Sequence, residues 1–491
     1  MFGLLKTGII HRSAGGSAAG EVGGSIGLDT QLNRLFSFLR ENALIFYAGI
    51  GMGLYRCAHE WPLWFNAAVA HVGVGPLFEG GFFFLLVDMG KVAGLVAYLA
   101  LCYGFDAHRR SGFLLALPSA LIVAGCLVPL LVVLGIDPGP RVVVASLVLI
   151  GGGAGMLFAQ WIEFCGYLPP VKVIQVFAVS FAVRFVVLPL VTGVDALSST
   201  LLVMALAGTS FVQVAFCFDK VPSLGASPRV ATGAGSLSGF GTLFLFVCVF
   251  AFAYGLCGSA TSLSHSASET GWGTVLPSVV VLVLAFEMGD RFDRTILYAI
   301  ALPLMTAGLI GVEFLGVSPS LSQVLVSAAY STFDLLVYTL VCSSAYQNRT
   351  SAMLPGSCVR VFALVAADAA IVLMRLVPAL NSGVVVTITI FAAVGAGIVV
   401  FAPRLGDRRA YASFQPQERT SERERLGAVA TAKGLSQRET TVFHLLVEGK
   451  TATEISEELF ISNGAVRAHC SRIYDKFGVH SRKDFDALLR R

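Results

Sequence analysis

The sequence predicts an all-α protein made of a large polytopic membrane domain and a small helical domain at its C-terminal end. Two observations carry this prediction. Hydrophobic residues make up 56% of the 491 residues and charged residues only 13%, whereas about 25% of the residues of a soluble domain are charged. Apolar stretches long enough to cross a bilayer recur up to residue 402, and residues 435–491 are polar with a helical periodicity.

Residues 1–33 are rich in Gly, Ala and Ser and carry three basic or imidazole side chains, Lys6, His11 and Arg12. Their apolar run is only a few residues long, which is too short for the core of a signal peptide. We therefore expect a flexible cytoplasmic leader, followed by a membrane domain over residues 34–403.

The membrane domain is expected to contain twelve spanning helices, because each apolar stretch has about the 20 residues that a bilayer requires. The stretches lie near residues 36–56, 81–104, 113–135, 142–165, 171–192, 196–218, 236–258, 274–290, 295–316, 319–343, 359–379 and 382–402.

The basic residues of the loops give an orientation. With the N-terminus inside, nine fall in cytoplasmic loops and two in the opposite loops, as the positive-inside rule requires. The nine are Arg109, Arg110, Lys172, Lys220, Arg229, Arg291, Arg294, Arg349 and Arg360, and the two are Arg56 and Arg141. An even number of spans returns the C-terminus to the cytoplasm.

Two segments of the membrane domain repeat each other. The loop Asp106–Arg110 leads into Ala116–Pro118, and the loop Asp290–Arg294 leads into Ala301–Pro303, 185 residues further on. This six-plus-six arrangement, with Asp/Arg loops after spans two and eight, resembles the major facilitator superfamily, although Asp293 stands where its motif has glycine. The resemblance implies two halves around a central cavity.

Several ionisable residues fall within the predicted spans, where they are costly in lipid and are candidates for function. Asp88 and Lys91 are three residues apart and can pair, and Asp368 and Arg375 are seven apart on one helix face. Glu163 lies near a span end and is expected to reach the membrane interface. The candidates for ligand binding or coupling are Asp88, Lys91, Arg184, Glu313, Asp334, Asp368 and Arg375. Internal pairing that only holds helices together is the alternative interpretation.

Residues 404–433 form a charged linker, with alternating charges from Glu418 to Arg425. The ten cysteines show no CxxC pair and no regular spacing, so we expect them to be reduced and structural. We find no metal-binding motif, no cofactor motif and no nucleophile constellation, and therefore expect no enzymatic activity.

Residues 434–491 are expected to form four helices, because each helix has its own start signal. The signals are two capping boxes (Ser436 with Glu439, Thr451 with Glu454), two N-caps (Ser462 and Ser481) and two C-terminal glycines (Gly449 and Gly478).

The second and third of these helices are joined by residues 460–462, about the length of a helix-turn-helix turn. In such motifs the following helix, here Asn463–Phe477, lies in the major groove of DNA. The segment resembles the LuxR-type helix-turn-helix of bacterial transcription regulators. The residues that carry the resemblance are Leu435-Ser436-x-Arg438-Glu439, Glu448-Gly449-Lys450, Glu454-Ile455, Leu459-Phe460-Ile461-Ser462, Val466-Arg467-x-His469, Ile473-Tyr474-x-Lys476 and Gly478-Val479-x-Ser481-Arg482.

The resemblance implies a set of DNA-binding residues. They are Thr451, Asn463, Arg467, Ala468, Ser471, Arg472 and Lys476. Arg467, Ala468 and Ser471 would face base edges, whereas Thr451, Arg472 and Lys476 would lie near phosphates. Because Ala468 and Ser471 are small and Ala465 replaces the usual threonine, base readout is expected to rest on Arg467. A helical module that binds a protein partner is the alternative.

The sequence thus predicts a one-component transcription regulator in the cytoplasmic membrane, with both termini in the cytoplasm. Its expected partners are double-stranded DNA, membrane lipid, an unidentified small-molecule ligand and a second copy of the chain, since helix-turn-helix proteins read paired half-sites. Two alternatives are a transporter with an appended regulatory helical domain and a membrane-tethered DNA anchor that senses nothing.

Overall fold

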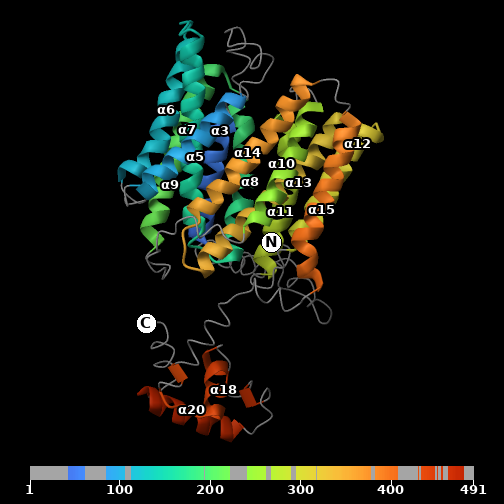
Figure 1. Cartoon of the computed structure of the whole chain (residues 1–491). Helices are drawn as coiled ribbons and strands as arrows, with labels where there is room; N and C mark the ends of the chain where they lie inside the picture. The colour runs from blue at the N-terminus through green and yellow to red at the C-terminus, as the bar shows by residue number, and fades with distance from the viewer. Residues whose placement is uncertain are drawn as a thin grey trace, which may run out of the picture. The chain divides into compact units, whose positions relative to one another are not determined.

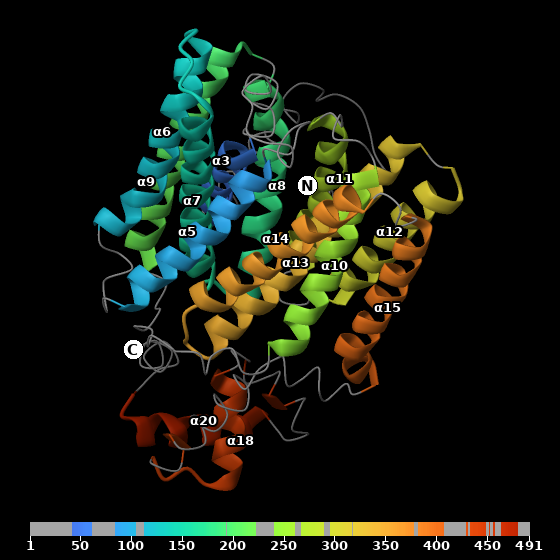
Figure 2. The ribbon, with the colours of Figure 1, turned by 45° about the horizontal axis from the view of Figure 1, so that its top comes forward.

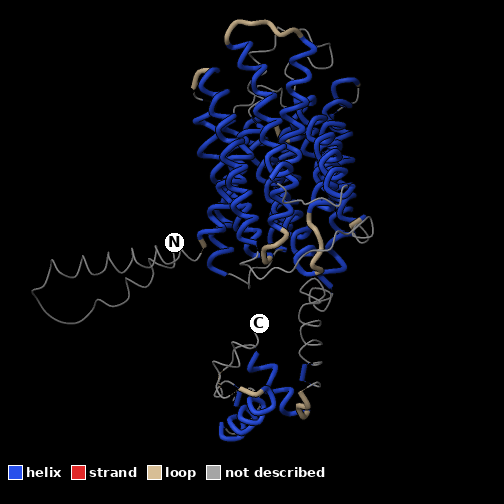
Figure 3. The backbone as a smooth tube through the Cα atoms, turned by 90° about the vertical axis from the view of Figure 1, so that its left-hand side faces the viewer, coloured by secondary structure: helices blue, strands red, loops and turns tan. Residues whose placement is uncertain are grey.

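The computed structural model of the chain consists of helices and short connections, with no strand among the residues that it describes (Figures 1 and 3). These residues are 42–60, 84–104, 112–192, 194–221, 240–260, 267–288, 295–316, 318–377, 382–406, 429–430, 433–447, 451, 455–456 and 463–479. They fall into two compact units, one before and one after the boundary between Phe401 and Ala402.

The first unit contains two sets of helices that follow one another in the chain. The first set is α3 (Ala43–Glu60), α5 (Phe84–Gly104), α6 (Gly112–Val133), α7 (Pro140–Cys165), α8 (Pro170–Thr192) and α9 (Ala196–Lys220). The second set is α10 (Gly241–Ala260), α11 (Ala267–Met288), α12 (Thr295–Phe314), α13 (Pro319–Gln347), α14 (Met353–Leu376) and α15 (Ser382–Gly406).

Among the described residues, seven helices are long and apolar enough to cross a membrane, namely α5, α6, α7, α8, α9, α13 and α14. The helices α3, α10, α11, α12 and α15 contain shorter apolar segments. Every apolar stretch predicted from the sequence overlaps one of these helices. The largest consequence of a shifted boundary is at α14, which begins at Met353 rather than near residue 359 and therefore places Arg360 about two turns inside the helix.

Several helix starts follow directly from local sequence. Asp195 caps α9, because its carboxylate accepts a hydrogen bond from the amide of Ser198 at 2.9 Å. Ser318 caps α13 through the amide of Leu321, and proline follows it at the first helical position.

The two sets of helices pack in the same way. In the first set, α7 packs against α5 and α6, and α3 packs against α8. The corresponding helices of the second set repeat these contacts, since α13 packs against α11 and α12, and α10 against α14. Figures 1 and 2 show α6, α7 and α9 on one side of the unit and α10, α12 and α15 on the other. The repeat predicted from the sequence is therefore present in the packing.

The two halves meet mainly through α8 and α11, with further contacts between α5 and α14 and between α8 and α13. Side chains on these helices can therefore form a site to which both halves contribute.

Small residues permit the closest helix approach in the first half. Gly151 on α7 lies against the backbone of Val87 on α5, and Gly94 on α5 lies against the backbone of Gly152. A Cβ atom at Gly151 or Gly94 would collide with those backbone atoms. Close backbone packing of this kind is a main source of helix association in lipid, where water does not drive helices together.

The second unit contains α18 (Gln437–Val447) and α20 (Asn463–Phe477), which pack against each other. Phe443 of α18 stacks on Phe477 of α20 with ring centroids 5.3 Å apart. Ile455, a helical residue between them in sequence, belongs to the same core. The second and fourth helices predicted from the sequence, apart from residues 455–456, lie outside the described residues.

The capping box predicted for α18 is confirmed. The amide of Ser436 donates to Glu439 at 2.8 Å, and the amide of Glu439 donates to the Ser436 hydroxyl at 3.3 Å. Gly478 ends α20 with φ 69°, the left-handed conformation predicted for that position. The turn at residues 460–462 and the caps Gly449, Ser462 and Ser481 lie outside the described residues.

Candidate nucleic-acid interface and intramembrane charge cluster

Helix α20 has a buried face and an exposed face. Its buried residues are Val466, Cys470, Ile473 and Phe477. Its exposed residues include Arg467, Ala468, Ser471 and Arg472. Since apolar side chains at helical spacing attach one face to the domain, the opposite face presents two guanidinium groups to solvent.

Lys476 holds α20 in its orientation. Its ammonium group donates to Glu439 of α18 and to the carbonyl of Gly434, both at 2.8 Å. The hydrogen bond from Lys476, followed by that from the Ser436 amide, lowers the pKa of Glu439 from 4.5 to about 2. The structure therefore gives Lys476 an intradomain partner, although the resemblance implied a phosphate contact for it.

The other DNA-binding residues implied by the resemblance have different degrees of exposure. Thr451 is exposed and Asn463 is partly buried at the start of α20. The Nε atom of Arg472 donates to the carbonyl of Ala468 at 3.2 Å, one turn back, and its side chain remains exposed. Arg467 and Arg472 thus belong to one solvent-exposed face.

The expected pairing of Asp88 and Lys91 is confirmed. On α5 their charged atoms lie 2.6 Å apart, and both side chains are largely buried. Asp368 of α14, in the other half, lies within electrostatic reach of both Asp88 and Lys91. The cluster therefore places two carboxylates and one ammonium group at the contact between the two halves.

Arg360 overturns a prediction, because it is not a cytoplasmic loop residue. It lies inside α14, with a side chain only 16% exposed, and its guanidinium is 4.0 Å from the carboxylate of Asp334 on α13. The same guanidinium lies 5.6 Å from the ring centroid of Phe158 on α7. The prediction failed because a charge beside an apolar stretch was interpreted as the end of the span.

Arg56 is a second such correction. It was assigned to an external loop, but it lies in α3 and is buried. Its guanidinium stacks over Phe181 of α8 at 4.1 Å from the ring centroid and lies 5.6 Å from that of Phe177. Aromatic faces attract cations, and Phe177 and Phe181 lie one turn apart on α8, so both rings can face the same guanidinium.

Glu163 is the third correction, because its side chain is buried within the protein rather than exposed at the end of the span. It is 1% exposed, and its carboxylate accepts hydrogen bonds from the Ser351 hydroxyl at 2.7 Å and from the Met353 amide at 3.0 Å. Tyr103 of α5 also donates to the Ser351 hydroxyl, at 3.4 Å. We call these contacts the Glu163 bridge; it joins α5 and α7 of the first half to the segment before α14.

Arg184, Glu313 and Arg375 are the remaining candidates. Arg184 is buried in α8, and its backbone carbonyl accepts a hydrogen bond from the thiol of Cys57 on α3 at 3.8 Å. Glu313 and Arg375 belong to α12 and α14, but their side chains lie outside the description. Within the described part of the chain, no group of three or more His, Cys, Asp or Glu side chains could hold a metal ion.

Comparisons with known proteins show a family resemblance for part of the second unit. Residues 433–486 match the GerE family, which comprises bacterial regulatory proteins of the luxR type. A stretch of 48 residues is 52% identical to the spore germination protein GerE of Bacillus subtilis, and 52 residues are 46% identical to the Fimbriae Z protein of Escherichia coli K12. The alignments cover 10% and 11% of this chain, and 65% and 25% of those proteins.

The first unit has a structural counterpart. The crystal structure of the human organic anion transporter MFSD10 (TETRAN) aligns with 73% of this chain and 98% of that chain, with a TM-score of 0.51 and 13% sequence identity. At this identity the similarity shows the fold alone. The chain therefore carries a helix-turn-helix domain of the GerE/LuxR type at residues 433–486, together with a helical membrane domain of the MFS-like fold.

Proposed function

We propose that the protein is a membrane-bound transcription regulator, in which the GerE/LuxR-type domain binds promoter DNA and the MFS-like domain controls that binding. The observation that carries the proposal is the exposed face of α20, which presents Arg467 and Arg472 within a domain that matches this family. Guanidinium groups suit this role because they bind guanine edges and phosphates.

Within this proposal, the DNA contacts are divided between two kinds of residue. Arg467, with Ala468 and Ser471 beside it, reads base edges. Thr451, Asn463 and Arg472 contact the sugar-phosphate backbone. Lys476 stabilises the domain instead, because its ammonium group is already bound to Glu439.

We further propose a membrane domain of twelve spans over residues 34–403, preceded by a cytoplasmic leader at 1–33 and followed by a linker at 404–433 and the DNA-binding domain at 434–491. Removing Arg360 and Arg56 from the loop count leaves eight basic residues on the cytoplasmic side and one, Arg141, on the other. This asymmetry supports an orientation in the inner membrane with both termini on the cytoplasmic side. We assign no enzymatic step to the chain.

Control by the membrane domain requires two conformations. A signal molecule or a change in the membrane shifts their equilibrium only by its difference in affinity for the two states. We propose that the two halves rock against each other and thereby change how two C-terminal domains pair on adjacent half-sites, which makes a homodimer the active form.

The test of DNA binding is a footprinting experiment with the full-length protein in lipid nanodiscs, on DNA that flanks its own gene. We expect a protected site that is lost in Arg467→Ala. Arg438→Ala is the matched control, because Arg438 is an exposed arginine on α18 of the same domain. Equal protection by wild type and Arg467→Ala, or none by either, would contradict the proposal.

A transporter with an appended regulatory domain is the second candidate. It is favoured by the charged residues that both halves contribute, Asp88 with Lys91 and Asp368. It predicts uptake into proteoliposomes of at least one member of a panel of radiolabelled organic acids, amines and sugars, lost in Asp368→Asn. Regulation without transport predicts altered promoter output and no uptake.

A further inference from the structure

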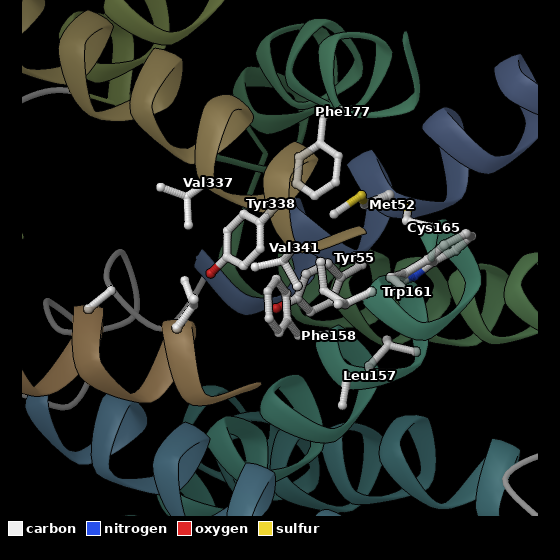
Figure 4. Close-up of a cluster of buried hydrophobic side chains, with 14 of the residues drawn as sticks. Met52, Tyr55, Leu157, Phe158, Trp161, Cys165, Phe177, Val337, Tyr338 and Val341 are labelled. Carbon is white, nitrogen blue, oxygen red and sulfur yellow. The ribbon is translucent and has the colours of Figure 1, made fainter. Parts of the chain in front are cut away.

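Two polar side chains inside the membrane domain, Tyr338 and Arg360, have donors that make no short hydrogen bond among the described residues. The hydroxyl of Tyr338 on α13 is buried and has no hydrogen-bond partner among the described residues. Figure 4 shows the Tyr338 ring between Phe177 and Phe158, with its oxygen turned away from Phe177. A buried hydroxyl without a partner is costly, so a bound acceptor that takes its hydrogen bond would remove that cost.

Arg360, whose guanidinium lies near the same Phe158 ring, also has hydrogen-bond donors without a close acceptor among the residues that the structure describes. In the described part of the chain, its one ionic contact is Asp334, at 4.0 Å. Hydrogen-bonded pairs of arginine and carboxylate lie about 2.7–2.9 Å apart and are often bidentate. The distance to Asp334 therefore leaves the five N–H donors of Arg360 available for an acceptor of another molecule.

The local charge favours an anion. The charged side chains that act most strongly on Tyr338 are Asp334, Arg360 and Arg56, two cations and one carboxylate. Asp368 lies within electrostatic reach of Asp88, Lys91 and Arg360, in the neighbouring ion-pair cluster. At the Tyr338 hydroxyl itself, the two guanidinium groups thus outnumber the one carboxylate.

Aromatic rings surround these polar groups. Tyr338 stacks on Phe177 with centroids 5.6 Å apart and meets Phe158 edge to face at 5.2 Å. Arg360 lies over Phe158, and Arg56 over Phe181 and Phe177. Rings of this kind pack favourably against another aromatic ring.

We propose that Arg360, Tyr338 and Arg56 recognise an organic anion that carries an aromatic ring, of which an aromatic carboxylate is the simplest form. Its carboxylate pairs with the Arg360 guanidinium and accepts a hydrogen bond from Tyr338, while its ring packs on Phe158. Because α3 and α8 belong to the first half and α13 and α14 to the second, the bound anion favours the conformation in which both halves surround it. This inference rests on the proposed function, since it names the chemical class of the signal.

The test measures binding of radiolabelled benzoate, phenylacetate and indole-3-acetate to the full-length protein in nanodiscs, each compared with its uncharged amide. We expect at least one acid to bind about tenfold or more tightly than its amide, because the amide loses the charge-assisted hydrogen bond. Arg360→Gln is expected to lower the affinity for that acid by at least about tenfold, and Arg360→Lys by less, since lysine keeps the charge.

Two further variants serve as a second test and as a control. Tyr338→Phe removes only the hydroxyl and keeps the ring, so it tests the site even when Arg360→Gln fails to fold; we expect it to bind the acid several-fold more weakly. Arg141→Gln, an exposed arginine at the start of α7, is the matched control and should bind as wild type does. Equal binding of acids and amides, no binding of any acid, or full affinity in both Arg360→Gln and Tyr338→Phe overturns the proposal.

The same preparations are footprinted on DNA, which separates the two proposals. DNA protection without binding of any acid removes the anion site and leaves the regulator. Binding of an acid without DNA protection keeps the anion site and removes the regulator.

Discussion

The carboxylate of Glu163 on α7 lies 2.7 Å from the hydroxyl of Ser351, the residue two positions before α14. The same carboxylate oxygen accepts the amide of Met353, the first residue of α14. Hydrogen bonds to an ionised group in a buried place are among the stronger ones in proteins. The Glu163 bridge therefore joins the two halves at one end of the helices, and separating the halves at that end requires breaking it.

Replacing Glu163 with glutamine should destabilise the membrane domain, because the neutral amide is a weaker acceptor for two donors. We expect a loss of about 1.5–3 kcal/mol, the range for hydrogen bonds to charged groups, and a smaller loss for Ser351→Ala. Thermal unfolding of the full chain in nanodiscs measures both. Asp137→Asn, whose carboxylate accepts the Gly139 amide in an exposed loop, is the control; equal melting temperatures for Glu163→Gln and this control would contradict the prediction.

The contact between α5 and α7 yields a comparison of two adjacent glycines. Gly151→Ala should lower the melting temperature and the yield of folded protein, because its Cβ would collide with the backbone of Val87; overpacking of this kind costs about 1–3 kcal/mol or more. Gly152→Ala should be tolerated, because its Cβ would lie 3.7 Å from the Gly90 carbonyl, an ordinary contact. A similar effect of both substitutions on yield and melting temperature would show that the close approach of α5 and α7 at Gly151 does not determine stability.

Asp88, Lys91 and Asp368 should contribute to stability as one coupled group. Asp88→Asn leaves Lys91 with Asp368 as a carboxylate within electrostatic reach. We expect a modest loss of stability for Asp88→Asn alone and a loss of about 3–5 kcal/mol when Asp368→Asn is added, since an uncompensated buried charge is costly. A double-mutant cycle on thermal or denaturant unfolding measures the coupling, and strictly additive effects would argue against the group.

The second unit should lose stability in acid through Glu439. Its pKa is about 2 in the folded domain, against an ordinary value of 4.5. The unfolded chain therefore takes up a proton first, so this stabilisation is fully present above about pH 4.5 and disappears as the pH falls through about 2. Hydrogen exchange of the α18 amides between pH 5 and pH 2 should show it, and the pH dependence should be weaker in Glu439→Gln.

Arg472 and Lys476 should differ in their effect on DNA binding. Arg472→Ala should weaken binding to all sequences and reduce the slope of log affinity against log salt by about one, as loss of one phosphate contact does. Lys476→Ala should leave that slope unchanged and lower the melting temperature of the domain, because it removes the ion pair with Glu439. Titrations at several salt concentrations distinguish the two, and an equal change of slope would place Lys476 on the phosphate.

The sequence was most informative where the physical cause is local. The capping box of Ser436 and Glu439 and the glycine after α20 were predicted from residues within one turn of each other, and the structure contains both. The pair Asp88 and Lys91 was predicted for the same reason, since its members are one turn apart on one helix.

The failures share a cause as well. Arg56, Glu163 and Arg360 were assigned to loops or to the interface because each lies near the end of an apolar stretch. Their environment is set by residues far away in sequence: Phe181 for Arg56, Ser351 for Glu163, and Asp334 with Phe158 for Arg360. No periodicity or propensity contains that information.

By itself, the sequence determined the two-part architecture, the positions of the apolar helices and the family of the C-terminal domain, because hydropathy, capping and motif spacing are local properties. Only the tertiary structure decided which charges face one another, that Lys476 is bound to Glu439, and that Tyr338 and Arg360 share one cluster with Arg56. Those relationships arise when two sets of helices pack together, since the energy of a buried charge depends on the partners that packing brings to it.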